Sequence, residues 1–71
     1  QMQVGQGTVR SNRLTDEGLK LFREGKTRLA AAKFRQALRA NPRNARAHAL
    51  AAELALNDNR LVVARQHVAE A

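Results

Sequence analysis

Gly25, Lys26 and Thr27 have the residue order in which a nucleotide-binding P-loop ends. Such a loop cradles phosphate with backbone N–H groups and a lysine. It needs a further glycine five residues before the glycine of Gly-Lys-Thr, and it follows a buried strand. Lys20 stands at that position, and the preceding residues have the apolar spacing of a helix. The sequence therefore predicts a turn between two helices here, with Lys26 exposed, and no phosphate site.

The other residue types that could do chemistry are also poorly placed for it. His48 and His67 lie 19 residues apart (67 − 48), whereas a zinc site needs several ligands at close spacing, as in His-x-x-x-His. Asp16 and Glu17 are expected in the first turns of a helix, where carboxylates offset the helix dipole. Cysteine is absent, which removes disulfides and thiolate ligands. We predict no catalytic residue, no metal and no cofactor, and hence no enzyme.

Length and charge restrict the partners. A chain of 71 residues is one small domain with a thin core. Its 13 Lys and Arg against 6 Asp and Glu leave a charge of +7, which favours an acidic protein, a nucleic acid or anionic lipid. The basic residues are spread along the sequence, and its only aromatic residues are two Phe, too few for a base-stacking platform. The favoured interpretation of the charge is that Arg and Lys simply solvate the helix faces. We expect a protein or peptide partner, for which an acidic character is one option, and regard nucleic acid as the less favoured partner.

The alternative function is therefore binding of nucleic acid or another polyanion by a basic surface. Its residues would be Lys20, Arg23, Arg28, Lys33, Arg35, Arg39, Arg43 and Arg46. No apolar run approaches the roughly 18 residues of a membrane span, and no signal-peptide layout is present. The compartment is not indicated. Because the sequence starts at Gln1 and stops inside an apolar pattern, we expect a piece of a longer protein or a processed product.

The elements that must position these residues are all helical. Residues 1–10 contain two Gly and three Gln and are expected to be a flexible N-terminal tail. From Ser11 onward, helix-forming residues dominate. Apolar residues follow helical spacing along four successive faces: Leu14, Gly18, Leu21 and Phe22; Leu29, Ala30, Phe34, Ala37 and Leu38; Ala45, Ala49, Ala52 and Leu56; and residues 61–71. Chain reversals are predicted near Gly25, at Asn41-Pro42 and at residues 57–59.

An internal repeat connects the two halves. A shift of 34 residues (52 − 18) places Gly18 on Ala52 and Gly25 on Asn59, and it pairs large apolar residues with large apolar ones. Gly and Asn enter the left-handed conformation that closes a helix at the lowest cost. The repeat thus predicts the same helix–turn–helix unit twice.

These residues resemble a tetratricopeptide repeat (TPR), a 34-residue pair of antiparallel helices. The residues that match the family's pattern in order and spacing are Leu14, Gly18, Leu21, Ala30, Phe34, Ala37 and Pro42. The resemblance implies a first TPR-like helix pair at 11–44 and a second, truncated pair at 45–71, stacked as a short α-solenoid. Departures from the pattern, such as His48 and Ala55 in place of the second repeat's aromatics, imply looser packing there.

What the resemblance implies for function is a non-catalytic protein-interaction or scaffold module. Helix-packing positions would be Leu14, Gly18, Leu21, Ala30, Phe34, Ala37, Ala52, Ala64 and Val68. Partner contacts on the concave face would be Asn12, Thr15, Leu19, Phe22, Arg23, Arg46, Ala49, Leu50, Glu53, Leu56 and Asn57. Phe22 could equally pack against the neighbouring repeat. Thr15 and Leu19 replace the Lys and Asn with which some members grip a C-terminal carboxylate, so that activity is not expected.

Self-association is the remaining expectation. Two repeats are fewer than the roughly three that usually make such a stack stable. The last helix would leave an apolar face uncovered, which favours a homo-oligomer through that helix. The residues of this face are Leu61, Val62, Ala64, Val68 and Ala71.

Overall fold

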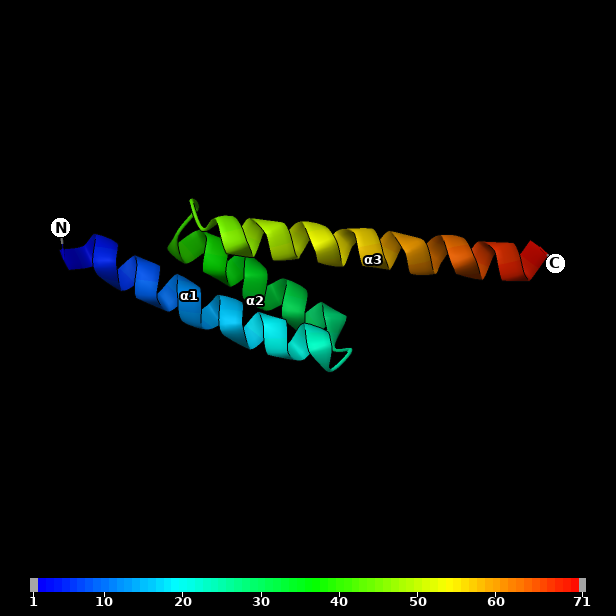
Figure 1. Cartoon of the computed structure of the whole chain (residues 1–71), viewed down its shortest axis with the longest axis horizontal. Coiled ribbons are helices and arrows are strands. Elements are labelled where there is room, and N and C mark those ends of the chain that lie inside the picture. Colours follow the sequence, from blue (N-terminus) through cyan, green and yellow to red (C-terminus); the bar gives the residue numbers. More distant parts are fainter. Residues whose placement is uncertain (1, 71) are drawn as a thin grey trace.

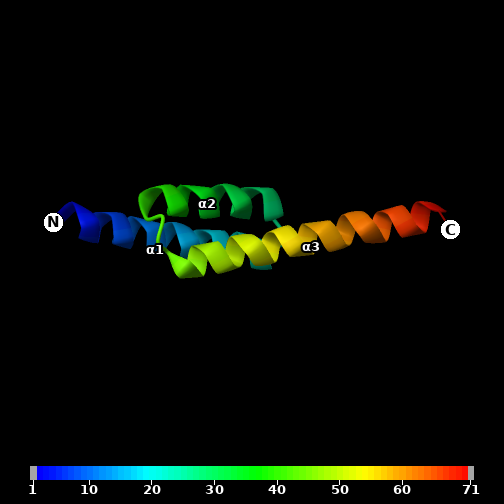
Figure 2. The ribbon, with the colours of Figure 1, turned by 90° about the horizontal axis from the view of Figure 1, so that it is seen from above.

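The chain forms three α-helices in a computed structural model that describes the backbone of residues 2–70 and the side chains of residues 5–58. They are α1 (Met2–Arg23), α2 (Thr27–Ala40) and α3 (Ala45–Glu70). Within residues 2–70 no strand occurs, which confirms the all-α prediction. The helices α1 and α2 form an antiparallel hairpin, and α3 returns along it in the direction of α1 (Figure 1). Figure 2 shows that α2 covers one side of the α1–α3 pair. The C-terminal end of α3 projects beyond the other two helices.

The turn between α1 and α2 is made by Gly25. This residue has a φ of 81°, its N–H donates to the Phe22 carbonyl at 3.0 Å, and the Lys26 N–H donates to the Leu21 carbonyl at 2.9 Å. Together these bonds form the Schellman motif, in which a left-handed residue satisfies the last carbonyls of a helix. The Gly-Lys-Thr segment therefore closes a helix, as predicted, and lacks the strand that precedes a phosphate-binding loop.

Exchanging two glycines for alanine should have opposite effects on stability. We expect Gly25→Ala to lower the free energy of unfolding by about 1–2 kcal/mol, because a Cβ strains the left-handed conformation. Gly5 lies inside α1, and a Cβ there would meet nothing within 4 Å. Gly5→Ala should therefore raise the free energy of unfolding by about 0.5–1 kcal/mol. Urea unfolding followed by far-UV circular dichroism compares the two, and equal shifts would contradict the assignment of the turn.

Residues 2–10, which belong to the expected N-terminal tail, lie in α1, because this helix begins at Met2. Each glycine in a helix interior costs about 1 kcal/mol relative to alanine, so local propensity disfavours this helix. The close contact at Gly7 explains why the helix nevertheless forms here, since a Cβ on this residue would lie 2.9 Å from the Ala40 carbonyl oxygen. The missing side chain lets the start of α1 pass close to the end of α2, and this contact supports the additional turns.

The core of the hairpin lies between Gly18 and Phe34. Phe34, Ala30 and Ala37 have no exposed surface. A Cβ on Gly18 would lie only 2.5 Å from Cε1 and 2.7 Å from Cδ1 of the Phe34 ring, so the ring packs directly on the α1 backbone. Leu14 and Leu21 are half-buried at the edges of this interface. Small residues on one helix thus admit a single large ring from the other.

The third reversal, predicted at residues 57–59, is absent, since α3 continues to Glu70. One helix hairpin followed by one long helix therefore replaces the two stacked pairs expected from the repeat. Asn and Asp each cost only some tenths of a kcal/mol in a helix. Without a Gly or Pro, these residues do not end a helix unless tertiary contacts make the reversal favourable. The predicted packing roles of Ala64 and Val68, and the apolar face at 61–71, lie outside the described side chains.

The buried face of α3 is also displaced from the predicted one. Ala47 is buried, and Leu50, Ala51 and Leu54 are half-buried, whereas Ala52 is exposed. The other predicted face positions, Ala45, Ala49 and Leu56, are exposed as well. In an alanine-rich segment two neighbouring helix faces are equally apolar, so periodicity does not decide between them. Asn44, which directly precedes α3, is hydrogen-bonded to Ser11 and Thr15 of α1 and so fixes how the start of α3 is placed.

Candidate partner-binding groove

A buried polar cluster connects the start of α3 to α1. Ser11, Thr15 and Asn44 are 0%, 0% and 7% exposed. The Asn44 amide Nδ2 donates to Ser11 Oγ at 2.8 Å and to Thr15 Oγ1 at 3.2 Å, with a longer bond of 3.4 Å to Asn12 Oδ1. Ser11 Oγ donates to the Ala37 carbonyl at 2.7 Å. No described buried side-chain polar atom lacks a partner, so the cluster avoids the penalty of an unpaired buried group.

Asn44 is at the same time the N-cap of α3. Its Oδ1 accepts the Ala47 N–H at 3.1 Å, and its carbonyl accepts the His48 N–H at 3.1 Å, which is the bonding pattern of an N-cap asparagine. His48 Nε2 donates to the Pro42 carbonyl at 2.8 Å and so braces the preceding loop. One amide thus caps α3 with its oxygen and holds it to α1 with its nitrogen.

Thr15, one of the predicted partner contacts, lies in the buried cluster. Its side chain is fully buried, and its hydroxyl donates to the Ser11 carbonyl at 2.8 Å. It therefore positions α3 and has no surface for a partner. An available signal was Asn44 itself, since Asn directly before a periodic apolar segment is an N-cap signature. No sequence signal connects Asn44 to Ser11, because the two are 33 residues apart.

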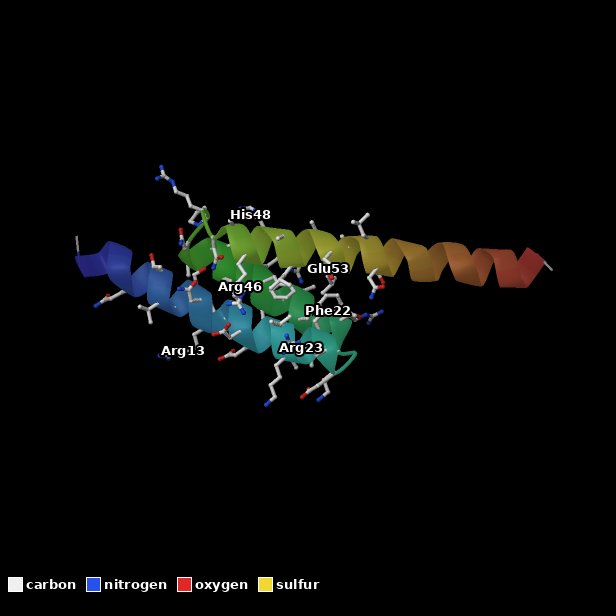
Figure 3. All side chains as sticks on the ribbon, in the orientation of Figure 1. Arg13, Phe22, Arg23, Arg46, His48 and Glu53 are labelled. Carbon is white, nitrogen blue, oxygen red and sulfur yellow. The ribbon has the colours of Figure 1, made fainter. Side chains whose placement is uncertain are left out.

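With α3 held in this position, two concavities follow each other between α1 and α3. The first is lined by Asp16, Leu19, Lys20, Arg23, Glu24 and Arg46. The second is lined by Phe22, Glu53, Leu56 and Asn57. Together they are called the α1–α3 groove here, and Figure 3 shows Phe22, Arg23, Arg46 and Glu53 in the region between the two helices. Predicted partner contacts from both helices thus come together in one surface.

The predicted contacts differ in how they take part. Leu19 and Phe22 are half-buried in the groove, whereas Arg23, Glu53 and Asn57 are exposed along it. Leu56 is 59% exposed, which is high for a large apolar side chain. Asn12 and Ala49 are exposed and Leu50 is half-buried, but none of the three lines the groove.

Ion pairs join the helices at the surface. Arg46 Nη1 lies 2.7 Å from Asp16 Oδ1 across the groove, and Lys33 Nζ lies 2.9 Å from Glu17 Oε2 between α2 and α1. Asp16 and Glu17 are therefore interhelical partners in the middle of α1, and their predicted place in its first turns is wrong. Pairs this exposed contribute about 0–1 kcal/mol each, so the Arg46–Asp16 pair can open for a ligand at little cost.

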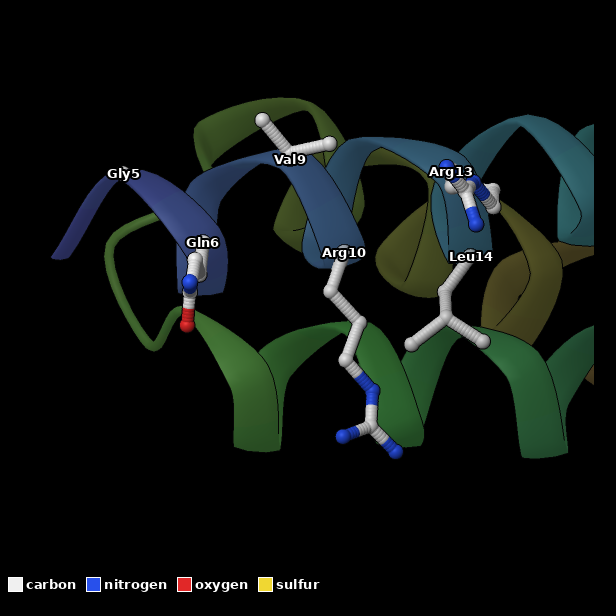
Figure 4. A pocket seen from close by; sticks show the side chains of 6 residues that line it. All are labelled: Gly5, Gln6, Val9, Arg10, Arg13 and Leu14. Carbon is white, nitrogen blue, oxygen red and sulfur yellow. The ribbon is translucent and has the colours of Figure 1, made fainter. Parts of the chain in front are cut away.

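A third, shallow concavity lies on α1 alone (Figure 4). Its lining residues are Gly5, Gln6, Val9, Arg10, Arg13 and Leu14. Leu14 points toward α2, whereas Val9 points away from it and is 58% exposed. Among the side chains that the structure describes, none from α2 or α3 lines this surface.

The part of the chain with described side chains contains neither a metal-ligand cluster nor a membrane-spanning helix. There, no three His, Cys, Asp or Glu residues come close enough to hold a metal ion. Within the same part, none of the helices combines the length and the apolar character needed to cross a bilayer. In comparisons with known proteins, no family model matches the chain, and neither the curated proteins nor the solved structures include a significant match.

Proposed function

We propose that this chain is a non-catalytic protein-interaction module, built on a TPR-like helix pair, that binds a segment of a partner protein in the α1–α3 groove. The observation that carries the proposal is the groove itself. It juxtaposes Leu19, Phe22 and Leu56 with charged side chains from two helices that are more than 20 residues apart in sequence.

The lining of the groove defines the ligand. Leu19, Phe22 and Leu56 offer partly exposed apolar surface for one or two large side chains. The first concavity holds Lys20, Arg23 and Arg46 against Asp16 and Glu24, a net charge of +1 (3 − 2), and Glu53 lines the second. A peptide with an apolar anchor and an adjacent acidic residue complements this order, in an extended or a helical conformation.

The TPR-like frame is supported by the buried residues of the hairpin. Gly18, Ala30, Phe34 and Ala37 stand where the family's pattern has its packing residues, and all four are buried. In repeats of this kind, the first helix of each pair lines the concave surface. The groove is formed by α1 and the first half of α3, which would be those helices.

Peptide selection with matched variants tests the proposal. A random 12-residue peptide library displayed on phage is selected against the full chain, and the affinity of the recovered peptide is measured by fluorescence anisotropy. We expect an apolar residue next to Asp or Glu in the recovered sequence. Leu19→Asp and Arg23→Glu should each weaken binding at least about tenfold, the loss of roughly 1.4 kcal/mol that marks an anchor position.

Two substitutions outside the groove serve as controls. Leu29→Asp changes an α2 leucine that is 57% exposed, and Arg13→Glu changes an exposed arginine of α1. Neither residue lines the groove, so both variants should bind the peptide as the unmodified protein does. Recovered peptides that bind Leu19→Asp and Arg23→Glu unchanged would show that the groove is not the binding site.

A further inference from the structure

The solvent face of α2 carries a stripe of arginines. Arg28, Arg35 and Arg39 are all exposed, and at about 100° per residue they lie within roughly 40° of one another around the helix axis. The buried residues Ala30, Phe34 and Ala37 occupy the opposite side of the same helix. These three arginines are called the α2 arginine stripe below.

No arginine of the stripe has an ion-pair partner among residues 5–58. The sequence has no Asp or Glu between Glu24 and Glu53, so α2 contains no carboxylate of its own. The ion pairs found among residues 5–58 join Lys26 to Glu24, Lys33 to Glu17 and Arg46 to Asp16, and none of them involves an arginine of the stripe. Three guanidinium groups therefore face solvent without neutralisation, although the basic residues are dispersed in the sequence.

We propose that the α2 arginine stripe binds the phosphate backbone of a double-stranded nucleic acid, independently of the groove. Guanidinium groups bind phosphate oxygens through two parallel hydrogen bonds. At about 1.5 Å per residue, the stripe extends over roughly 16 Å of helix, which is long enough to span several phosphates of one strand.

The other polyanionic surfaces fit this face less well. A helix that lies in a membrane interface inserts an apolar face among the lipids, and the apolar face of α2 is already buried against the rest of the fold. Single-stranded nucleic acid is bound by stacking of bases on aromatic rings. Phe34 is completely buried, and Phe22 lines the groove. Contact with a duplex backbone requires positive charge, but it requires neither an exposed apolar helix face nor exposed aromatic rings.

The test measures binding of the full chain to a fluorescein-labelled 20-base-pair DNA duplex of arbitrary sequence. Three phosphate contacts predict a salt slope of about −2.7, or ~40-fold weaker binding at 200 mM than at 50 mM salt. Arg35→Gln/Arg39→Gln should reduce the slope by about 2 and weaken binding at 50 mM salt roughly tenfold or more. Circular dichroism checks that the variants stay folded.

A matched pair of arginines on α1 separates the stripe from net charge. Arg13 and Arg23 are exposed (Figure 3), and Arg13→Gln/Arg23→Gln removes the same charge as the stripe variant. Retained duplex binding by this control supports the proposal, and an equal loss would overturn it. Absence of duplex binding at 50 mM salt would also overturn it, as would tighter binding to phosphatidylserine vesicles than to the duplex. Arg23 also lines the groove. If the control variant loses peptide binding but keeps duplex binding, the two sites are distinct.

Discussion

Asn44→Ala is expected to lower the free energy of unfolding by about 2–4 kcal/mol. The substitution removes the side-chain cap of α3, which contributes about 1 kcal/mol. It also removes the amide N–H groups that Asn44 donates to the buried Ser11 and Thr15 hydroxyls, and leaving buried polar groups without a partner costs about 1–3 kcal/mol. A domain of this size has a total stability of only about 4–10 kcal/mol. Urea unfolding followed by far-UV circular dichroism measures the loss.

Two further asparagine variants show which part of the side chain matters. Asn44→Asp keeps an oxygen for the Ala47 N–H but no longer donates to the Ser11 and Thr15 hydroxyls. We therefore expect its free energy of unfolding to lie between that of the unmodified chain and that of Asn44→Ala. Asn57→Ala makes the same change at an exposed position within α3 and should leave stability unchanged or slightly higher. Equal effects of Asn44→Ala and Asn57→Ala would show that the buried cluster does not hold α3.

Phe34→Ala is expected to cost about 3–5 kcal/mol, because it removes the largest fully buried side chain among residues 5–58 and leaves a cavity against α1. Gly18→Ala acts on the same contact from the other side. Its Cβ would stand 2.5 Å from the Phe34 ring, so the ring must shift, and overpacking of this kind costs about 1–3 kcal/mol. Both losses are read from urea unfolding curves.

The contact between the two residues predicts that their effects are not additive. Phe34→Leu shortens the side chain and makes room for the new Cβ of Gly18→Ala. The double variant should therefore be more stable than the sum of the single losses predicts, by about 0.5–3 kcal/mol. A purely additive result would mean that Gly18 and Phe34 do not share the crossing. Gly5→Ala combined with Phe34→Leu is the additive control, since nothing lies within 4 Å of a Cβ at Gly5.

The local features of the hairpin could be predicted from the sequence. Gly25 closes α1 because only glycine enters the left-handed region without strain. The Asn41-Pro42 pair separates α2 from α3 because proline lacks an N–H and fixes its own φ. Helical spacing indicated Leu29, Ala30, Phe34, Ala37 and Leu38 as one apolar face. Ala30, Phe34 and Ala37 are buried and Leu38 is half-buried, whereas Leu29 is 57% exposed. Each of these outcomes depends on the conformational preferences of a few neighbouring residues.

Only the tertiary structure decided which residues act across helices. The early start of α1 depends on Gly7 meeting the Ala40 carbonyl, and the burial of Thr15 depends on Asn44. The α2 arginine stripe, and the meeting of Phe22 with Leu56 in the groove, likewise need the helices to be placed. The free energies that decide these features belong to contacts between residues about 30 positions apart. Propensity and periodicity describe a single helix, so neither contains those contacts.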